Sequence, residues 1–238
     1  MKIALIGYGK MGKMLEQTAL QRGHEIVSRI DIDNFGDISS DEFRSADVAL
    51  EFTIPAVAEH NIRTVWEQNV KVVSGTTGWA DGLQTLKNEL KTNGKTLFWA
   101  SNFSLGVNVF FEINKHLAKI MNAFPQYNLS MEEIHHLEKK DAPSGTAITL
   151  AETILSQLDR KNGWTLSPEK KEQHIEITAH RQPNVAGIHT VKYESLEDTI
   201  SLTHNAKSRA GFALGAVLAA EFTHNKTGFL GMKDLLRF

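Results

Sequence analysis

A glycine pattern near the start of the chain constrains its fold more than any other feature. Gly7, Gly9 and Gly12 fit GxGxxG, with a β-favouring run over residues 2–6 before them and a helical pattern over residues 13–22 after them. In such a strand–turn–helix unit the first glycine permits the tight turn, the second lets a pyrophosphate approach the backbone, and the third lets the helix pack on the strand. Amides at the helix start then bind the phosphates. We therefore expect a dinucleotide site rather than a glycine-rich turn without a ligand.

The same fingerprint requires an acidic residue about 20 positions later, at the end of the second strand, to accept hydrogen bonds from the adenosine ribose hydroxyls. Asp31 follows Gly12 at this spacing, and Asp33 is a competitor two positions later. Either carboxylate could instead be an ordinary solvated turn residue. We expect Asp31 to bind the ribose.

Strands and helices alternate over the first hundred residues. We expect strands at residues 25–32, 48–53, 70–74 and 96–100, with helices at 57–68 and 81–92. This alternation predicts a parallel sheet with helices on both faces.

The regular alternation of strands and helices ends after Ala100. Residues 107–123 and 145–158 read as helices, residues 128–136 as a strand, and residues 173–204 alternate as strands do. We expect these strands to form a second, mixed or antiparallel layer, and residues 159–172 to form an exposed excursion.

Composition limits the possible partners and surroundings. The length of 238 residues suits one or two domains, with two favoured, and the net charge of -2 provides no basic footprint for nucleic acid or an anionic membrane. The absence of Cys excludes disulfides and thiolate chemistry and suits a reducing cytoplasm. The most apolar stretch, residues 212–222, is too short to span a membrane and predicts a buried helix. The apolar run at residues 3–6 is too short for an export signal.

Reactive side chains are densest between residues 132 and 147. His135, His136 and Lys139 can supply protons near neutral pH. The segment from Pro143 to Thr146 predicts a capped helix start whose free amides and threonine hydroxyl form an anion cradle. An exposed charged loop before an ordinary capped helix is the alternative. We expect no metal, because the sequence has no HExxH motif and no evident third ligand.

The string from His135 through Asp141-Ala142-Pro143-Ser144-Gly145-Thr146-Ala147 resembles the signature of the 4-hydroxy-tetrahydrodipicolinate reductase (dihydrodipicolinate reductase) family. Other segments typical of the family occur in its order and span nearly the whole chain: residues 7–12, 51–55, 75–78, 100–108 and 204–209.

The resemblance implies roles for individual residues. His135 and Lys139 take the acid and base roles, His136 helps to hold the substrate, and Ser144, Gly145 and Thr146 bind a substrate carboxylate. Thr77 lies where nicotinamide and substrate meet. The residues implied to line the cofactor groove are Gly7, Tyr8, Gly9, Lys10, Met11, Gly12, Asp31, Phe52, Thr53, Gly75, Thr76, Thr77, Ala100, Ser101, Asn102 and Phe103.

The resemblance also implies the architecture. It is an α/β fold: a Rossmann-type doubly wound parallel sheet with an inserted α+β domain for substrate binding and oligomerisation. Residues 1–103 and 210–238 form the discontinuous dinucleotide-binding domain, whose last helix returns from the C-terminus. Residues 104–209 form the substrate-binding and tetramerisation domain, so a cytoplasmic homotetramer is expected.

The implied activity is NAD(P)H-dependent reduction of 4-hydroxy-tetrahydrodipicolinate, a cyclic imine with two carboxylates, to tetrahydrodipicolinate in lysine biosynthesis through diaminopimelate. Two alternatives are another small two-domain nicotinamide dehydrogenase, such as one acting on an amino-acid semialdehyde, and a nicotinamide sensor without turnover. The sensor hypothesis predicts a basic DNA-binding module, which the sequence does not contain.

The chain departs from the family pattern at three places. Glu138 stands where other members often carry His, and an ion pair between Glu138 and Lys139 could raise the lysine pKa. The loop 181–189 keeps an Arg, a late Gly and a His but lacks the usual early glycine. Ile32 stands where dual-specificity members tend to place Arg, so we expect NADH to be preferred, with NADPH possible through Arg29 or Lys10.

Overall fold

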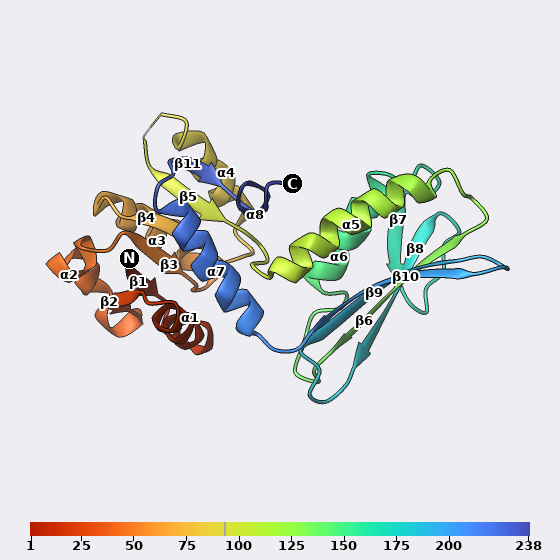
Figure 1. Ribbon diagram of the computed structural model, residues 1–238, viewed down its shortest axis with the longest axis horizontal. Helices are drawn as coiled ribbons and strands as arrows, with labels where there is room; N and C mark the ends of the chain where they lie inside the picture. The colour runs from red at the N-terminus through yellow and green to blue at the C-terminus, as the bar shows by residue number, and fades with distance from the viewer. Residues whose placement is uncertain (93) are drawn as a thin grey trace. The chain divides into compact units, whose positions relative to one another are not determined.

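The chain crosses between two structural units twice, after residue 104 and after residue 209 (Figure 1). The computed structural model describes residues 1–92 and 94–238. Unit 1 comprises residues 1–104 and 210–238, and unit 2 comprises residues 105–209. Both termini therefore belong to unit 1, although unit 2 lies between its two parts in the sequence.

Unit 1 is built on a six-stranded parallel sheet in the order β11-β5-β4-β3-β1-β2. Its strands are β1 (Lys2–Ile6), β2 (Glu25–Ile30), β3 (Val48–Glu51), β4 (Lys71–Ser74), β5 (Thr96–Trp99) and β11 (Gly228–Leu230). The continuous burial of β1 after Lys2 and of all of β3 is what a sheet covered on both faces requires.

Helices cover both faces of this sheet. The helical elements of unit 1 are α1 (Lys10–Gln21), η1 (Ile32–Ser39, a 3₁₀ helix), α2 (Asp41–Arg44), α3 (Pro55–Glu67), α4 (Ala80–Glu89), α7 (Ala210–Thr223) and α8 (Met232–Leu236). Helices α3 and α4 bury apolar side chains in one cluster with alternate residues of the central strands, whereas α1 packs against α7. Gly215 lets α7 pack closely against the backbone at Phe103, because a Cβ on Gly215 would lie 1.7 Å from the carbonyl oxygen of Phe103.

Unit 2 is a five-stranded mixed sheet in the order β10-β9-β6-β8-β7. Its elements are α5 (Leu105–Met121), β6 (Asn128–His135), α6 (Gly145–Leu155), β7 (Gly163–Leu166), β8 (His174–Arg181), β9 (Gly187–Glu194) and β10 (Thr199–Ala206). Strands β6, β9 and β10 pair antiparallel, and β6, β8 and β7 pair parallel. Helices α5 and α6 share an apolar cluster with β6, β8 and β9, so they cover one face of the sheet.

The predicted fold class is confirmed: a Rossmann-type parallel sheet and a second α+β unit with a mixed sheet. The predicted buried helix is also present as α7. No helix within residues 1–92 or 94–238 is long and apolar enough to cross a membrane.

Two local predictions are wrong. The expected exposed excursion over residues 159–172 contains β7, whose Thr165 is buried, because β7 adds to the sheet edge by pairing with β8. The second strand ends at Ile30 rather than at residue 32, because Asp31 caps η1. Its side chain accepts a hydrogen bond from the amide of Ile32, and Asn34 accepts one from the amide of Asp31.

Candidate functional site

The glycine loop of unit 1 has the geometry that the pattern predicts. Gly7 has φ +88°, and a Cβ there would lie 2.2 Å from the carbonyl oxygen of Phe52. A Cβ on Gly12 would lie 2.2 Å from the carbonyl oxygen of Gly7. Nothing lies within 4 Å of the position of a Cβ on Gly9, which begins α1 without a side-chain cap. Packing thus requires Gly7 and Gly12, whereas Gly9 leaves space beside the first helical amides, where a phosphate binds well.

Asp31 lies at the predicted place, at the end of β2 beside this loop. Its Oδ2 accepts a hydrogen bond from the amide of Tyr8, at 3.2 Å. A cavity of about 560 Å³ extends from the loop across the carboxyl ends of β1, β2 and β3. Its walls include six predicted cofactor residues: Gly7, Tyr8, Gly9, Asp31, Phe52 and Thr53. Asp33, the competing acid, lies within η1 and does not line this cavity.

The other predicted cofactor residues also gather at the carboxyl edge of the sheet, where ligands of such sheets bind. Lys10, Met11 and Gly12 form the first turn of α1. Gly75, Thr76 and Thr77 follow β4, and Ala100, Ser101, Asn102 and Phe103 follow β5. Gly75 is close to Phe52, because a Cβ there would lie 2.1 Å from the phenyl ring, and Phe52 in turn lies against Phe103, with ring centroids 5.5 Å apart.

A buried carboxylate, Glu51, accepts hydrogen bonds from residues at this edge of the sheet. Ser74 and Thr76 donate hydroxyl hydrogen bonds to it at 2.6 and 2.9 Å, and Thr53 donates a third. Thr76 Oγ1 then accepts the backbone amide of Thr53 at 2.9 Å. Burial raises the pKa of Glu51, and the three hydroxyls oppose this rise. The sequence pattern does not single out Glu51, although it directly precedes the predicted Phe52.

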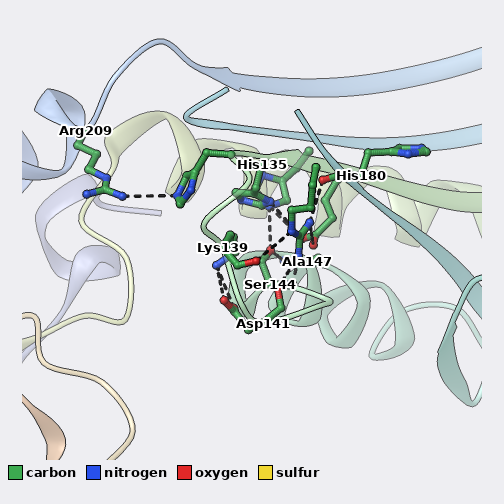
Figure 2. A network of polar contacts seen from close by, with 11 residues as sticks. His135, Lys139, Asp141, Ser144, Ala147, His180 and Arg209 are labelled. Atoms are coloured by element: carbon green, nitrogen blue, oxygen red, sulfur yellow. Dashed lines mark hydrogen bonds and ion pairs between the residues drawn. The ribbon is translucent and has the colours of Figure 1, made fainter. Parts of the chain in front are cut away.

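In unit 2 the predicted reactive residues cluster where β6 ends and α6 begins (Figure 2). Ser144 caps α6, as predicted, by accepting the amide of Ala147 at 3.2 Å. Gly145 opens the helix with nothing within 4 Å of the position of a Cβ, so a ligand can approach the backbone there. Thr146 follows in the first turn. Thr77, the remaining predicted substrate residue, belongs to unit 1.

The loop after β6 carries charged side chains that contact one another. Lys139 Nζ contacts both oxygens of Asp141, at 2.8 and 2.9 Å, and this pairing lowers the pKa of the Asp141 carboxyl. Glu138 instead contacts His136, with Oε2 2.9 Å from Nδ1. The other ring nitrogen of His136 lies 3.5 Å from Nη2 of Arg209. The carboxylate that contacts the Lys139 ammonium at hydrogen-bond distance is thus Asp141, while Glu138 contacts His136.

A buried carboxylate also lies at the centre of this second cluster. Glu133 is 0% exposed, and its Oε2 accepts the amide of Ser144 at 3.0 Å. The same oxygen is 3.8 Å from Nδ1 of His135 and 3.7 Å from Nε2 of His189. Strand alternation puts Glu133 on the same face as His135, and this periodicity is the signal that could have identified it.

Both buried imidazoles favour the neutral form. Burial, together with the charge of the neighbouring His135, lowers the pKa of His189 to about 3. Burial also lowers the pKa of His135, although the Glu133 carboxylate opposes the change. Nε2 of His189 lies 3.0 Å from Ser144 Oγ. Gly187 lies close to His135, because a Cβ there would lie 3.1 Å from its Nε2.

Arg181 joins the loop to the buried cluster. Its guanidinium donates to the carbonyl oxygens of Lys139 and Asp141 at 3.2 and 2.6 Å, and lies 3.5 Å from Glu133 Oε1. A lysine, an arginine and two neutral histidines therefore surround the start of α6. This arrangement can bind a carboxylate and move a proton beside it.

The sequence pattern around His135 and His136 shows no third metal ligand. The fold supplies a candidate, since Glu133, His135 and His189 offer ligand atoms within 4.8 Å of one another. Arg181 and the amide of Ser144 already direct positive charge at this carboxylate, which disfavours a cation there. A site without a metal remains our prediction.

Comparison with known proteins relates both parts of the chain to one family. Residues 1–103 match the family model described as dihydrodipicolinate reductase, N-terminus, and residues 106–236 match that for the C-terminus. The chain is 50% identical over 236 residues to the 4-hydroxy-tetrahydrodipicolinate reductase of Christiangramia forsetii, covering 99% of this chain and 98% of the relative. It is 34% identical to the enzyme of the same name from Archaeoglobus fulgidus, covering 99% and 100% of the two chains.

A solved structure has the same fold. The dipicolinate-bound dihydrodipicolinate reductase from Paenisporosarcina sp. TG-14 superposes with a TM-score of 0.75 at 23% identity, covering 98% of each chain.

Proposed function

The chain belongs to the dihydrodipicolinate reductase family, and from this premise we propose that it reduces 4-hydroxy-tetrahydrodipicolinate to tetrahydrodipicolinate with NADH as the preferred cofactor. The full-length match to reductases disfavours both a semialdehyde dehydrogenase and a sensor without turnover. The two parts of the chain that match the family have different roles in this reaction. Unit 1 binds the dinucleotide, and unit 2 binds the substrate.

The residues of unit 1 fit a dinucleotide. Gly9 leaves open space beside the uncapped start of α1, and Asp31 is held beside it by the amide of Tyr8. The first amides of α1 would hold the pyrophosphate, and Asp31 the adenosine ribose. Phe52, Thr53, Gly75 and Thr76 would line the nicotinamide end. When bound, the reduced nicotinamide supplies a hydride to the ring carbon C4 of the substrate.

The residues of unit 2 hold the dicarboxylate and handle the proton. Ser144, Gly145 and Thr146 present the first amides of α6 to one substrate carboxylate, and His136 helps to hold the ring. Lys139 donates the proton that completes the reduction, and His135 assists its transfer, while water leaves the ring. Asp141 holds the Lys139 ammonium at the loop until substrate arrives. These roles follow the family signature, and the clustering in unit 2 supports them.

The observation that carries this proposal is the convergence of His135, Lys139 and the start of α6 around the buried Glu133. The test is oxidation of NADH by the purified protein with substrate generated in situ by its synthase. Turnover that depends on both reactants is the expected result. No NADH oxidation with this substrate, in a protein that binds NADH, would refute the proposed reaction.

The preference for NADH rests on Asp31 and Ile32. The Asp31 carboxylate can accept both ribose hydroxyls of NADH but meets the 2′-phosphate of NADPH as a like charge. Because repulsion in an open groove is partly screened, we expect a bias of about ten-fold rather than exclusion. The measurement is kcat/KM for both cofactors at low and moderate salt. Equal or better use of NADPH at both salt concentrations would contradict this preference.

We also propose that the enzyme acts in the cytoplasm as a homotetramer assembled through unit 2. Helices α5 and α6 cover one face of the unit 2 sheet, and the opposite face carries exposed or half-buried side chains such as Ser130, Glu132, Thr190 and Thr203. The Thr190 and Thr203 hydroxyls lie 3.0 Å apart as a cross-strand pair on this face. Size-exclusion chromatography with light scattering tests the assembly, and a monomeric mass at micromolar concentration would contradict it.

A further inference from the structure

Arg29 is the cation best placed by the sequence to offset the charge of a 2′-phosphate, since it precedes Asp31 by two positions on β2. In the structure its guanidinium is engaged elsewhere. Nε of Arg29 donates to Oε1 of Glu16 on α1 at 3.0 Å, and Nη2 donates to the same oxygen. The Glu16 side chain is only 16% exposed, so this pair is partly shielded from water.

Glu16 is held from a second side by the glycine loop. The phenol of Tyr8 donates to Oε2 of Glu16, while the backbone amide of Tyr8 donates to Asp31. Tyr8 and Asp31 both line the 560 Å³ cavity. Glu16 thus fixes Arg29 through one oxygen and a cofactor-groove residue through the other.

The ion pair between Arg29 and Glu16 changes the charge that this end of the groove presents. The Arg29 and Glu16 charges offset each other, whereas the Asp31 carboxylate accepts hydrogen bonds from the neutral backbone amides of Tyr8 and Ile32. Hydrogen bonds from Arg29 and Tyr8 lower the pKa of Glu16, so the carboxylate stays ionised at neutral pH. Lys10, in the first turn of α1, is exposed and is the second candidate cation for a 2′-phosphate.

We propose that Glu16 is a specificity-determining residue, which selects against a 2′-phosphorylated dinucleotide by holding Arg29 away from the adenosine ribose. The inference rests on the proposed preference for NADH and names its cause beyond Asp31. Releasing Arg29 should provide the cation that a 2′-phosphate needs, because a guanidinium binds phosphate oxygens strongly.

The test compares binding of two adenosine fragments, 2′,5′-ADP and 5′-AMP, by isothermal titration calorimetry, alongside kcat/KM for NADPH and NADH. Glu16→Gln keeps the size of the side chain and an acceptor for Tyr8 but removes the charge that holds Arg29. It should raise the affinity ratio of 2′,5′-ADP to 5′-AMP by about five-fold at low salt, the scale of one exposed ion pair. The double variant Glu16→Gln with Arg29→Gln should return the ratio toward the wild-type value.

The control is Glu67→Gln, which removes an exposed carboxylate at the end of α3 and should leave the ratio unchanged. An unchanged ratio in Glu16→Gln, with 5′-AMP affinity retained, would overturn the inference. A raised ratio that persists in the double variant would overturn it as well, because Arg29 would then not be the cation. Loss of the reductase reaction itself would appear separately, as no NADH oxidation by the wild-type protein.

Discussion

The buried His189 predicts how the stability of this protein depends on acid. Burial lowers the pKa of His189 to about 3 in the folded protein, whereas a histidine in the unfolded chain titrates near its ordinary value of about 6.5. As the pH falls below about 6.5, His189 therefore binds a proton in the unfolded chain but stays neutral in the folded protein. The contribution of His189 to stability is present above this pH and is lost progressively down to about pH 3.

The expected loss between pH 7 and pH 5 is about 2 kcal/mol of unfolding free energy from this one residue. The assay is urea unfolding at both pH values and constant protein concentration, for the wild type and for His189→Gln. Glutamine can still contact Ser144 but cannot titrate. The wild type should lose about 2 kcal/mol more than the variant on going to pH 5.

The exposed His180, on strand β8 of the same sheet, provides the matched control. His180→Gln should lose as much stability as the wild type. Parallel losses in the wild type and in His189→Gln would refute the reasoning. They would mean that the folded protein accepts a proton on His189, with the Glu133 carboxylate 3.7 Å away compensating the imidazolium.

Four further substitutions, in three experiments, test other parts of the protein. Lys139→Ala should lower kcat by about 10²- to 10⁴-fold with the NADH dissociation constant nearly unchanged, and wild-type turnover would exclude Lys139 as the proton donor. Because burial raises the pKa of Glu51, its contribution to stability is present below the unfolded pKa and lost as pH rises through the folded pKa. Urea unfolding should therefore show the wild type losing stability relative to Glu51→Gln from about pH 4 toward neutrality, and a constant difference would contradict a raised pKa of Glu51. Gly12→Ala should lower the melting temperature, because its Cβ meets a backbone oxygen, whereas Gly9→Ala should keep the melting temperature and weaken NADH binding. Equal melting temperatures for the two variants would contradict this contrast.

The sequence alone determined those features that depend on neighbours along the chain. A short β-favouring run, a glycine pattern and a helical pattern suffice to predict β1, the loop and α1, because turn and helix formation depend on local backbone preferences. The choice of Asp31 follows from its spacing after Gly12. Similarly, Pro143 and Ser144 predict the start of α6, because proline and serine suit the first turn of a helix whatever surrounds it.

Only the tertiary structure decided which side chains become partners. Glu133 and His189 lie on β6 and β9, and their approach depends on the pairing of those strands, which no local pattern specifies. The sequence alone is compatible with Arg29 binding a phosphate, but in the folded protein α1 places Glu16 in an ion pair with Arg29. Likewise the contact of Lys139 with Asp141 depends on how the loop folds between β6 and α6. Ion pairs and pKa shifts depend on distance and burial, and these are properties of packing rather than of residue order.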